Sequence, residues 1–137
     1  MSAFLIDTNI VSELARKHPD PGVTNFMTTT PKLLVSTILF HELHYGLETA
    51  SIEVKARLTT FYAALRDQFG AAAIAVNLQI AETSARLRAF EKAQGRVLTL
   101  ADSIMAATAI NVGATLVTRN VKDFDNLGIE IINPFAH

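Results

Sequence analysis

Short apolar runs alternate with longer amphipathic segments along this chain, and this alternation limits its possible folds more than any other feature. The apolar runs predict strands at about residues 3–7, 33–36, 72–76, 114–117 and 129–132. The segments between them predict helices at about residues 10–16, 23–27, 37–49, 52–68, 78–94 and 99–112. Because the two kinds of element alternate, we expect an α/β fold around a parallel sheet.

The length and composition favour one globular domain. The 137 residues correspond to a single domain, residues 1–137, and half of them are hydrophobic, which argues against disorder. No apolar run approaches the ~18 residues that a membrane span needs, and the N-terminus lacks the basic segment of a secretory signal. The chain has no cysteine, which excludes disulfides and thiolate zinc sites and fits a cytoplasmic protein.

Four acidic residues lie beside segments that should be buried, where a protein gains little from a charge. They are Asp7, Glu42, Asp102 and Asp123. Since parallel sheets bind ligands at the carboxyl ends of their strands, these carboxylates are expected to share one pocket. Carboxylates at close range repel one another, so the pocket should hold a cation. Oxygen ligands without sulfur favour Mg²⁺ or Mn²⁺.

Helix capping is a simpler explanation for part of this pattern. Asp7, Thr8 and Asn9 can each accept a hydrogen bond from a free helix amide, although one cap needs only one of them. Thr99-Leu100-Ala101-Asp102 has the form of a capping box. Glu42 could be a solvent-facing helix residue. Capping does not explain why all four acids lie beside predicted strand ends.

The segment His41-Glu42-Leu43-His44 resembles a truncated zinc-protease helix. That motif needs histidines four residues apart so that both reach one metal, and here they are three apart. We therefore reject zinc hydrolysis and expect both histidines at the surface or in a partner contact. Carboxylate-bound Mg²⁺ or Mn²⁺ suits phosphoryl hydrolysis instead, in which a metal-bound water attacks the phosphorus in line.

Four motifs, in the right order, resemble those of the PIN-domain ribonucleases and in particular the VapC toxins of bacterial toxin–antitoxin pairs. They are Ile6-Asp7-Thr8-Asn9, then Ser36-Thr37 with Glu42-Leu43 and Tyr45-Gly46, then 102–109, and finally 116–124. The resemblance covers essentially the whole chain. It implies a three-layer α/β/α sandwich around a five-stranded parallel sheet. It also implies endonucleolytic cleavage of RNA that depends on Mg²⁺ or Mn²⁺, a homodimer, and a cognate antitoxin whose C-terminal segment blocks the site.

The resemblance implies a role for each matching residue. Carried over by motif, the three metal ligands are Asp7, Glu42 and Asp102. We expect Asp7 and Asp102 to hold the principal ion, while Glu42 and the fourth acid tune it or help to hold a second. Some members place that acid where this chain has Asn120 and others where it has Asp123. We choose Asp123, with Asn120 as a neutral ligand or hydrogen-bond partner. The residues expected to orient the carboxylates are Thr8, Asn9 and Thr118.

Other functions are disfavoured by residues of the chain. A haloacid-dehalogenase-like phosphatase also has Asp at the end of its first strand, but it needs a second Asp where this chain has Asn9. A phosphorylatable receiver domain needs Asp at the end of the third strand, where this chain reads Ala75-Val76-Asn77. A non-catalytic PIN-like binding module would have lost the acids, and all four are present. It remains the main alternative to an endoribonuclease.

The sequence says little about the RNA substrate. The net charge of −1 neither requires nor excludes a nucleic acid, so positive charge would have to be local. The candidates for contacts with RNA phosphates are Arg119, Lys122, Arg86 and Arg88. Each of them could equally be an ordinary solvated residue. Single-stranded or loop RNA is the general expectation.

Overall fold

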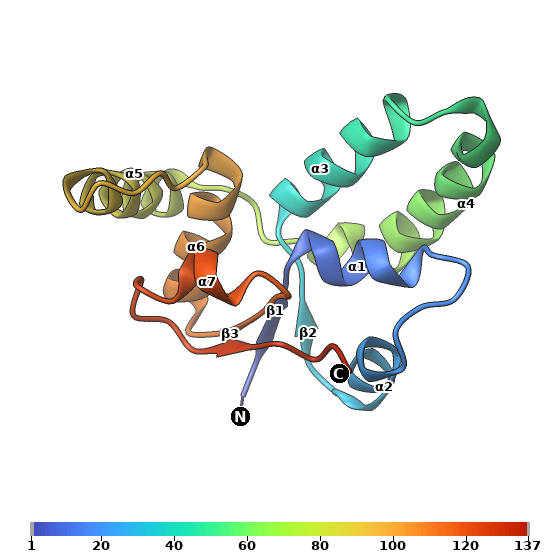
Figure 1. Ribbon diagram of the computed structural model, residues 1–137, viewed down its shortest axis with the longest axis horizontal. Helices are drawn as coiled ribbons and strands as arrows, with labels where there is room; N and C mark the ends of the chain where they lie inside the picture. Colours follow the sequence, from blue (N-terminus) through green and yellow to red (C-terminus); the bar gives the residue numbers. More distant parts are fainter. Residues whose placement is uncertain (1, 137) are drawn as a thin grey trace.

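A parallel sheet of four strands lies at the centre of the computed structural model, which describes residues 2–136 (Figure 1). Its strands are β1 (Phe4–Ile6), β2 (Leu33–Leu34), β3 (Thr115–Val117) and β4 (Ile131–Ile132). Their order in space is β2-β1-β3-β4, and each neighbouring pair is parallel. The parallel α/β fold predicted from the alternating pattern is therefore confirmed.

Helices cover the sheet on both sides. Over residues 2–136 they are α1 (Thr8–Leu14), α2 (Pro21–Thr29), α3 (Thr37–Glu48), α4 (Ile52–Phe69), the 3₁₀ helix η1 (Gly70–Ala72), α5 (Leu78–Ala93), α6 (Leu100–Val112) and α7 (Val121–Phe124). In Figure 1, α6 lies on one side of the strands and α1 and α2 lie on the other, while α5 packs along α6 and α3 pairs with α4. None of these helices is long and apolar enough to cross a membrane.

The two middle strands form the buried centre of the core. Leu5 and Ile6 of β1 pair with Leu116 and Val117 of β3, and all four side chains are fully buried. Strands covered on both faces are expected to be continuous apolar runs, as these are. Each such side chain contributes roughly 1.5–3 kcal/mol by leaving water. This burial fixes β1 and β3 and, with them, the residues that follow their ends.

Helix α6 is buried on most sides, as its small residues predict. Met105, Ala106, Ala107 and Ala109 are at most 1% exposed. Small side chains allow α6 to approach both α5 and the sheet closely, and its contacts with α5 are extensive. Because Asp102 lies in the first turn of α6, this packing also fixes the position of that carboxylate.

The expected fifth strand is absent from the described residues, so the prediction of a five-stranded sheet is wrong. Within residues 72–76, Ala72 is still part of η1. Only Ile74 forms a β-bridge, with Ser36. Ile74 donates its amide to the Val35 carbonyl (2.8 Å) and accepts from the Thr37 amide (3.0 Å). The physical reason is that β2 ends at Leu34 and the chain enters α3 at Thr37, which leaves almost no strand to pair with.

Two helices begin earlier than expected because acidic residues cap them. The α1 helix starts at Thr8 rather than residue 10, since the Asp7 carboxylate accepts the Thr8 amide. The α2 helix starts at Pro21 rather than residue 23, with Asp20 as its cap. The four-residue α7 helix was not predicted, because it is too short to show a helical period.

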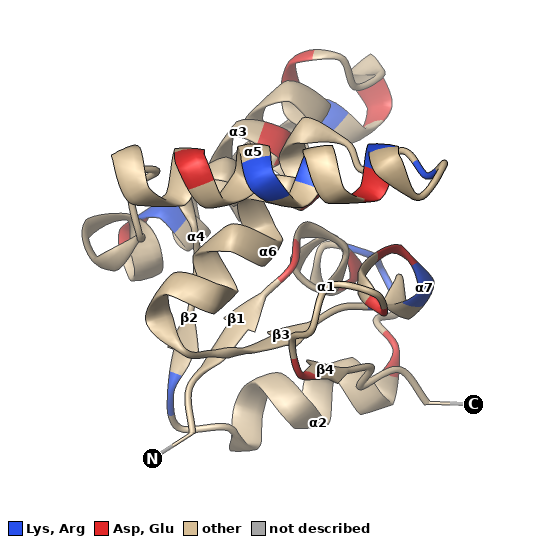
Figure 2. Ribbon diagram, turned by 90° about the vertical axis from the view of Figure 1, so that its left-hand side faces the viewer, with Lys and Arg blue, Asp and Glu red and all other residues tan. Residues whose placement is uncertain are grey.

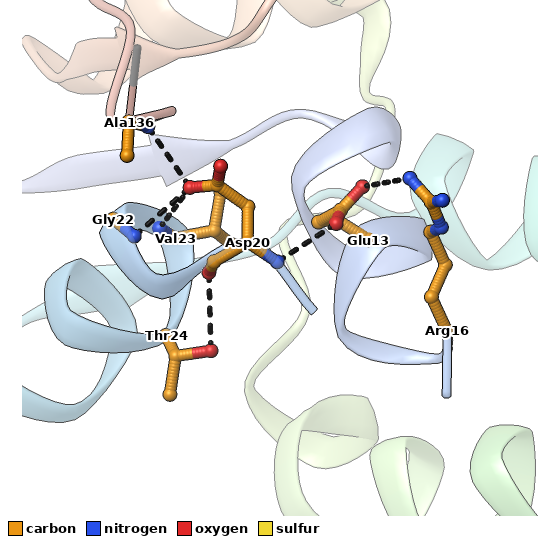
Figure 3. Close-up of polar contacts among 7 residues, drawn as sticks. All are labelled: Glu13, Arg16, Asp20, Gly22, Val23, Thr24 and Ala136. Atoms are coloured by element: carbon orange, nitrogen blue, oxygen red, sulfur yellow. Dashed lines mark hydrogen bonds and ion pairs between the residues drawn. The ribbon is translucent and has the colours of Figure 1, made fainter. Parts of the chain in front are cut away.

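The segment after β4 packs tightly against the beginning of α2 (Figure 3). Asp20 Oδ1 accepts hydrogen bonds from the amides of Gly22 (2.9 Å), Val23 (3.2 Å) and Ala136 (2.9 Å). A Cβ atom on Gly22 would lie 2.2 Å from the carbonyl oxygen of Pro134 and 2.7 Å from the amide nitrogen of Ala136. The close approach of the two segments therefore requires glycine at this position.

Replacing Gly22 with alanine should destabilise the protein by about 1–3 kcal/mol, because the new methyl group meets backbone that cannot move without breaking the Asp20 hydrogen bonds. The matched control is Gly46→Ala in α3, where a Cβ atom meets nothing within 4 Å. That variant should gain about 0.5–1 kcal/mol from helix propensity. Urea denaturation of both variants measures the difference. Equal stabilities would contradict the described packing of residues 133–136.

Candidate active site

Asp7 lies at the carboxyl end of the central strand, where the order of the strands reverses. Strand β1 pairs with β2 on one side and with β3 on the other, and the Asp7 amide donates to the Val117 carbonyl of β3 (2.9 Å). Open α/β sheets bind ligands at this switch point. Asp7 also caps α1, so capping and a place in the site are both features of the same residue.

A network of hydrogen bonds holds the Asp7 carboxylate. The Thr118 hydroxyl donates to Asp7 Oδ2 (2.7 Å), and Asn9 Nδ2 donates to the same oxygen (3.1 Å) and to Thr118 Oγ1 (3.1 Å). The Asn120 amide donates to Thr118 Oγ1 (3.0 Å), and the Arg119 amide donates to Asn9 Oδ1 (3.1 Å). These contacts fix the direction of the carboxylate and tie the loop after β3 to the loop after β1.

Two further carboxylates enter from helices. Glu42 lies in the second turn of α3, and its Oε1 accepts a hydrogen bond from the Thr8 hydroxyl (2.5 Å). Asp102 lies in the first turn of α6, where its amide donates to the capping hydroxyl of Thr99 (3.2 Å). Thr99 is therefore a helix cap, as the capping box predicts, and the Asp102 side chain is still directed to the same end of the sheet as Asp7.

One cavity of about 580 Å³ brings these groups together. Its lining residues are Asp7, Thr8, Asn9, Ser12, Glu13, Arg16, Glu42, Asp102, Arg119 and Asn120. Three of the four predicted acids line it, as do most of the polar residues expected to orient them. Ser12, Glu13 and Arg16 are members that the sequence did not reveal. Thr118 is fully buried behind the cavity and acts on it through Asp7.

The carboxylates influence one another electrostatically. Burial raises the pKa of the Asp7 carboxyl above its ordinary value, and the charge of Glu42 adds to this effect. Hydrogen bonds from Thr118 and from the Thr8 amide oppose it in part. Burial likewise raises the pKa of Asp102, and the charges of Asp7 and then Asp123 raise it further. The pocket therefore resists holding all its negative charges at once, which a cation would relieve.

The donor set fits a hard divalent cation. Asp7, Glu42 and Asp102 offer oxygen atoms alone, and such ligands suit Mg²⁺ or Mn²⁺. Within residues 2–136, no three acidic or histidine side chains converge closely enough to form a complete metal site. Mg²⁺ commonly retains several waters and binds through one or two carboxylates, so a cavity of this size suits a hydrated ion.

The two candidates for the fourth ligand differ in position. Asn120 lines the cavity. Asp123 is not among the lining residues, although it is near enough to Asp102 for its charge to raise the pKa of that carboxyl. A third observation is that the Asn120 side chain makes no capping hydrogen bond to α7, although Asn120 is its N-cap. The choice of Asp123 stays a prediction.

Only one of the predicted RNA-contacting residues lines the cavity. Arg119 does so, and its guanidinium lies 4.6 Å from the ring centre of Phe135. Arg86 donates to Thr83 (3.1 Å), and Arg88 donates to the Leu98 carbonyl (3.2 Å), both from α5. Figure 2 shows that charges of both signs are distributed along α5 rather than gathered into a basic surface.

Comparison with known proteins identifies similar chains over almost the full length. The family model described as "PIN domain" matches residues 4–130. The VapC ribonuclease Y4jK of Sinorhizobium fredii is 31% identical over 138 residues, covering 96% of this chain and 97% of the relative. Plasmid stability protein StbB of Pseudomonas syringae is 29% identical and covers 96% of this chain and 98% of the relative.

Solved structures show the same fold. The structure of FitAcB from Neisseria gonorrhoeae contains a chain with a TM-score of 0.86 and 25% identity, covering 96% of this chain and 97% of the other. VapBC2 from Rickettsia felis, bound to a DNA fragment from its promoter, gives a TM-score of 0.82 at 23% identity, with coverage of 96% and 98%.

The raised pKa values predict that a divalent cation stabilises the protein more at higher pH. Because Asp7 and Asp102 hold protons more tightly in the folded than in the unfolded chain, their ionisation lowers stability as the pH rises through the folded-state pKa values. A bound cation offsets this loss, whereas protons compete with it at lower pH. The increase in Tm caused by Mn²⁺ should therefore be larger at about pH 7.5 than at about pH 5. Calorimetry checks this, and an increase that does not depend on pH would contradict it.

Proposed function

This chain belongs to the PIN domain family, and from that premise we propose that it is a VapC-type toxin, an endoribonuclease that depends on Mg²⁺ or Mn²⁺. The observation that carries the proposal is that Asp7, Glu42 and Asp102 all line one cavity at the carboxyl end of β1. Relatives named as ribonucleases support the reaction class. Such a toxin would act on RNA in the cytoplasm.

The four acids and the residues that orient them each have a role in this proposal. Asp7 and Asp102 would hold the principal ion, while Glu42 and Asp123 would tune it or help to hold a second. A divalent cation held here would lower the pKa of a bound water and offset charge on a phosphodiester. The chain's own contribution is to position the carboxylates, through Thr118 and Asn9 for Asp7 and through Thr8 for Glu42. No nucleophilic side chain is required.

The hydrogen bonds around Asn9 disfavour the phosphatase alternative. That chemistry needs an acid/base carboxyl two residues after the first Asp. Here the Asn9 amide group donates to Asp7 and Thr118, and its carbonyl oxygen accepts from the Arg119 amide. Every polar atom of the side chain is thus engaged in fixing other groups. The non-catalytic module is disfavoured because the acids are retained and share one cavity.

We also propose a cognate antitoxin and a homodimer as partners. Similar structures include a toxin–antitoxin complex from Klebsiella pneumoniae and VapBC2 from Rickettsia felis bound to a DNA fragment from its promoter. An apolar cavity of about 400 Å³ lies beside the acidic one and shares Glu42 with it, and Ile38, Tyr45 and Leu100 line it. Tyr45 and Leu100 are 67% and 57% exposed. An antitoxin segment bound in this apolar cavity would cover the carboxylates. The exposed apolar side chains of α5, Leu78 and Phe90, suit contact with a second copy of the chain.

Asp7→Asn should abolish metal-dependent cleavage of RNA and leave the fold intact. Loss of a residue that orients a metal ligand commonly costs 10–100-fold, so loss of the ligand itself should reduce the rate by about 100-fold or more. The measurement is cleavage of single-stranded RNA by the purified protein with Mn²⁺, with circular dichroism as the control for folding. A fully active Asp7→Asn protein would falsify the assignment.

Asp123→Asn should weaken Mn²⁺ binding by roughly tenfold, since it removes a charge that acts on Asp102. Asn120→Ala should weaken it less, because a neutral amide contributes less to a cation site. Isothermal titration of the two variants with Mn²⁺ compares them directly. If Asn120→Ala weakened Mn²⁺ binding more than Asp123→Asn did, Asn120 rather than Asp123 would be the fourth ligand.

A further inference from the structure

The buried carboxylate of Glu13 has no part in the proposed chemistry. It lies in the last turn of α1 and lines the acidic cavity, and its side chain is only 7% exposed. Oε2 accepts the backbone amide of Asp20 (2.8 Å), and Oε1 accepts Nη1 of Arg16 (3.2 Å) (Figure 3). Burial of a charge is costly unless partners compensate for it, so this group needs an explanation.

The hydrogen bond from Asp20 does not by itself explain a charged residue. A neutral glutamine could accept the same amide at a lower cost of desolvation. What glutamate adds is a second oxygen with negative charge, and that oxygen contacts Arg16. The structure therefore uses the charge of Glu13 to hold the Arg16 guanidinium at the edge of the cavity.

Arg16 is held but remains available for a ligand. The contact with Glu13 uses Nη1, while 67% of the side chain stays exposed. The planar guanidinium has five donors and binds phosphate oxygens in pairs. Asp7 caps the start of α1 and Arg16 lies just beyond its end, and both residues line the same cavity. The length of α1 therefore separates Arg16 from Asp7, as a contact with a phosphate next to the scissile one requires.

Arg119 supplies a second cation from another element. It follows β3, lines the same cavity, and is held by the Phe135 ring and by the bond from its amide to Asn9. The two arginines are the basic residues among those that line the cavity. An RNA strand that approaches a group of carboxylates is repelled unless positive charge lies beside them. The two side chains provide such charge without occupying the position of the metal.

We propose that Arg16, positioned by Glu13, binds a backbone phosphate of the RNA adjacent to the scissile one, together with Arg119. The inference rests on the proposed ribonuclease function and extends it to the substrate-binding surface. It predicts that Arg16 acts on the affinity for RNA rather than on the metal or the chemical step.

The test compares Arg16→Gln with Lys17→Gln, the neighbouring cation, which does not line the cavity. Both proteins cleave a labelled single-stranded RNA of mixed sequence in the presence of Mn²⁺. For Arg16→Gln we expect KM to rise roughly tenfold, the value for a lost charged hydrogen bond, with little change in kcat. The slope of log(kcat/KM) against log[salt] should become shallower by about 0.7, which corresponds to one lost phosphate contact on a single strand. Lys17→Gln should behave as the wild type.

Two further variants separate position from charge. Arg16→Lys keeps the charge without the planar donor pair, so the salt slope should stay near that of the wild type while KM rises in part. Glu13→Gln retains an acceptor for the Asp20 amide but removes the charged partner of Arg16, so KM should rise with an unchanged affinity for Mn²⁺. If Glu13→Gln also prevented folding, the two Arg16 variants would carry the test alone.

The outcomes distinguish this inference from the function on which it rests. A wild-type protein that cleaves RNA, with an Arg16→Gln variant indistinguishable from Lys17→Gln in KM and salt slope, would overturn the inference alone. This result would also be expected if Arg16 bound an acidic partner protein. A wild-type protein that neither binds Mn²⁺ nor cleaves RNA would overturn both.

Discussion

The hydrogen bonds that hold the buried carboxylate of Asp7 are the interactions on which the rest of the site depends. A carboxylate that is 5% exposed is costly unless polar groups surround it. Thr118 and Asn9 provide those groups, and each also fixes a backbone amide in the loop after β3. A single charged side chain thus joins the connections that leave β1 and β3. The same hydrogen bonds therefore position both the two loops and the carboxylate of Asp7.

Most of the fold could be predicted from the sequence because buried parallel strands are apolar throughout, while the helices between them have one polar face. The strand predicted at 72–76 failed for a reason that no local pattern contains. A strand forms only where a partner extends beside it, and β2 ends before most of this segment arrives, so only Ile74 pairs. The early starts of α1 and α2 were predictable in principle from Asp7 and Asp20, which are ordinary helix caps.

The candidate site was predictable to a different extent for each residue. Asp7, Glu42 and Asp102 could be placed together because the carboxyl ends of parallel strands meet at one edge of a sheet. Glu13 and Arg16 could not, since a glutamate three residues before an arginine in a short helix is usually a solvated pair. The burial of Glu13 depends on its hydrogen bond from the Asp20 amide, which only the tertiary structure brings close. The one available signal was that Glu13 lies in, and Arg16 just beyond, the helix that Asp7 caps.

The pairing of the central strands also determines when this site can exist. Asp7 and Thr118 are separated by 111 residues in the chain, and β1 gains its second neighbour only when β3 has been made. At a synthesis rate of about 5–20 residues per second, roughly 6–20 s pass between these two events on the ribosome. A nascent or truncated chain that ends just before β3 has Asp7, Glu42 and Asp102 but no means of holding them together. The assembled site is therefore confined to chains whose synthesis has passed β3, so translation itself delays its appearance.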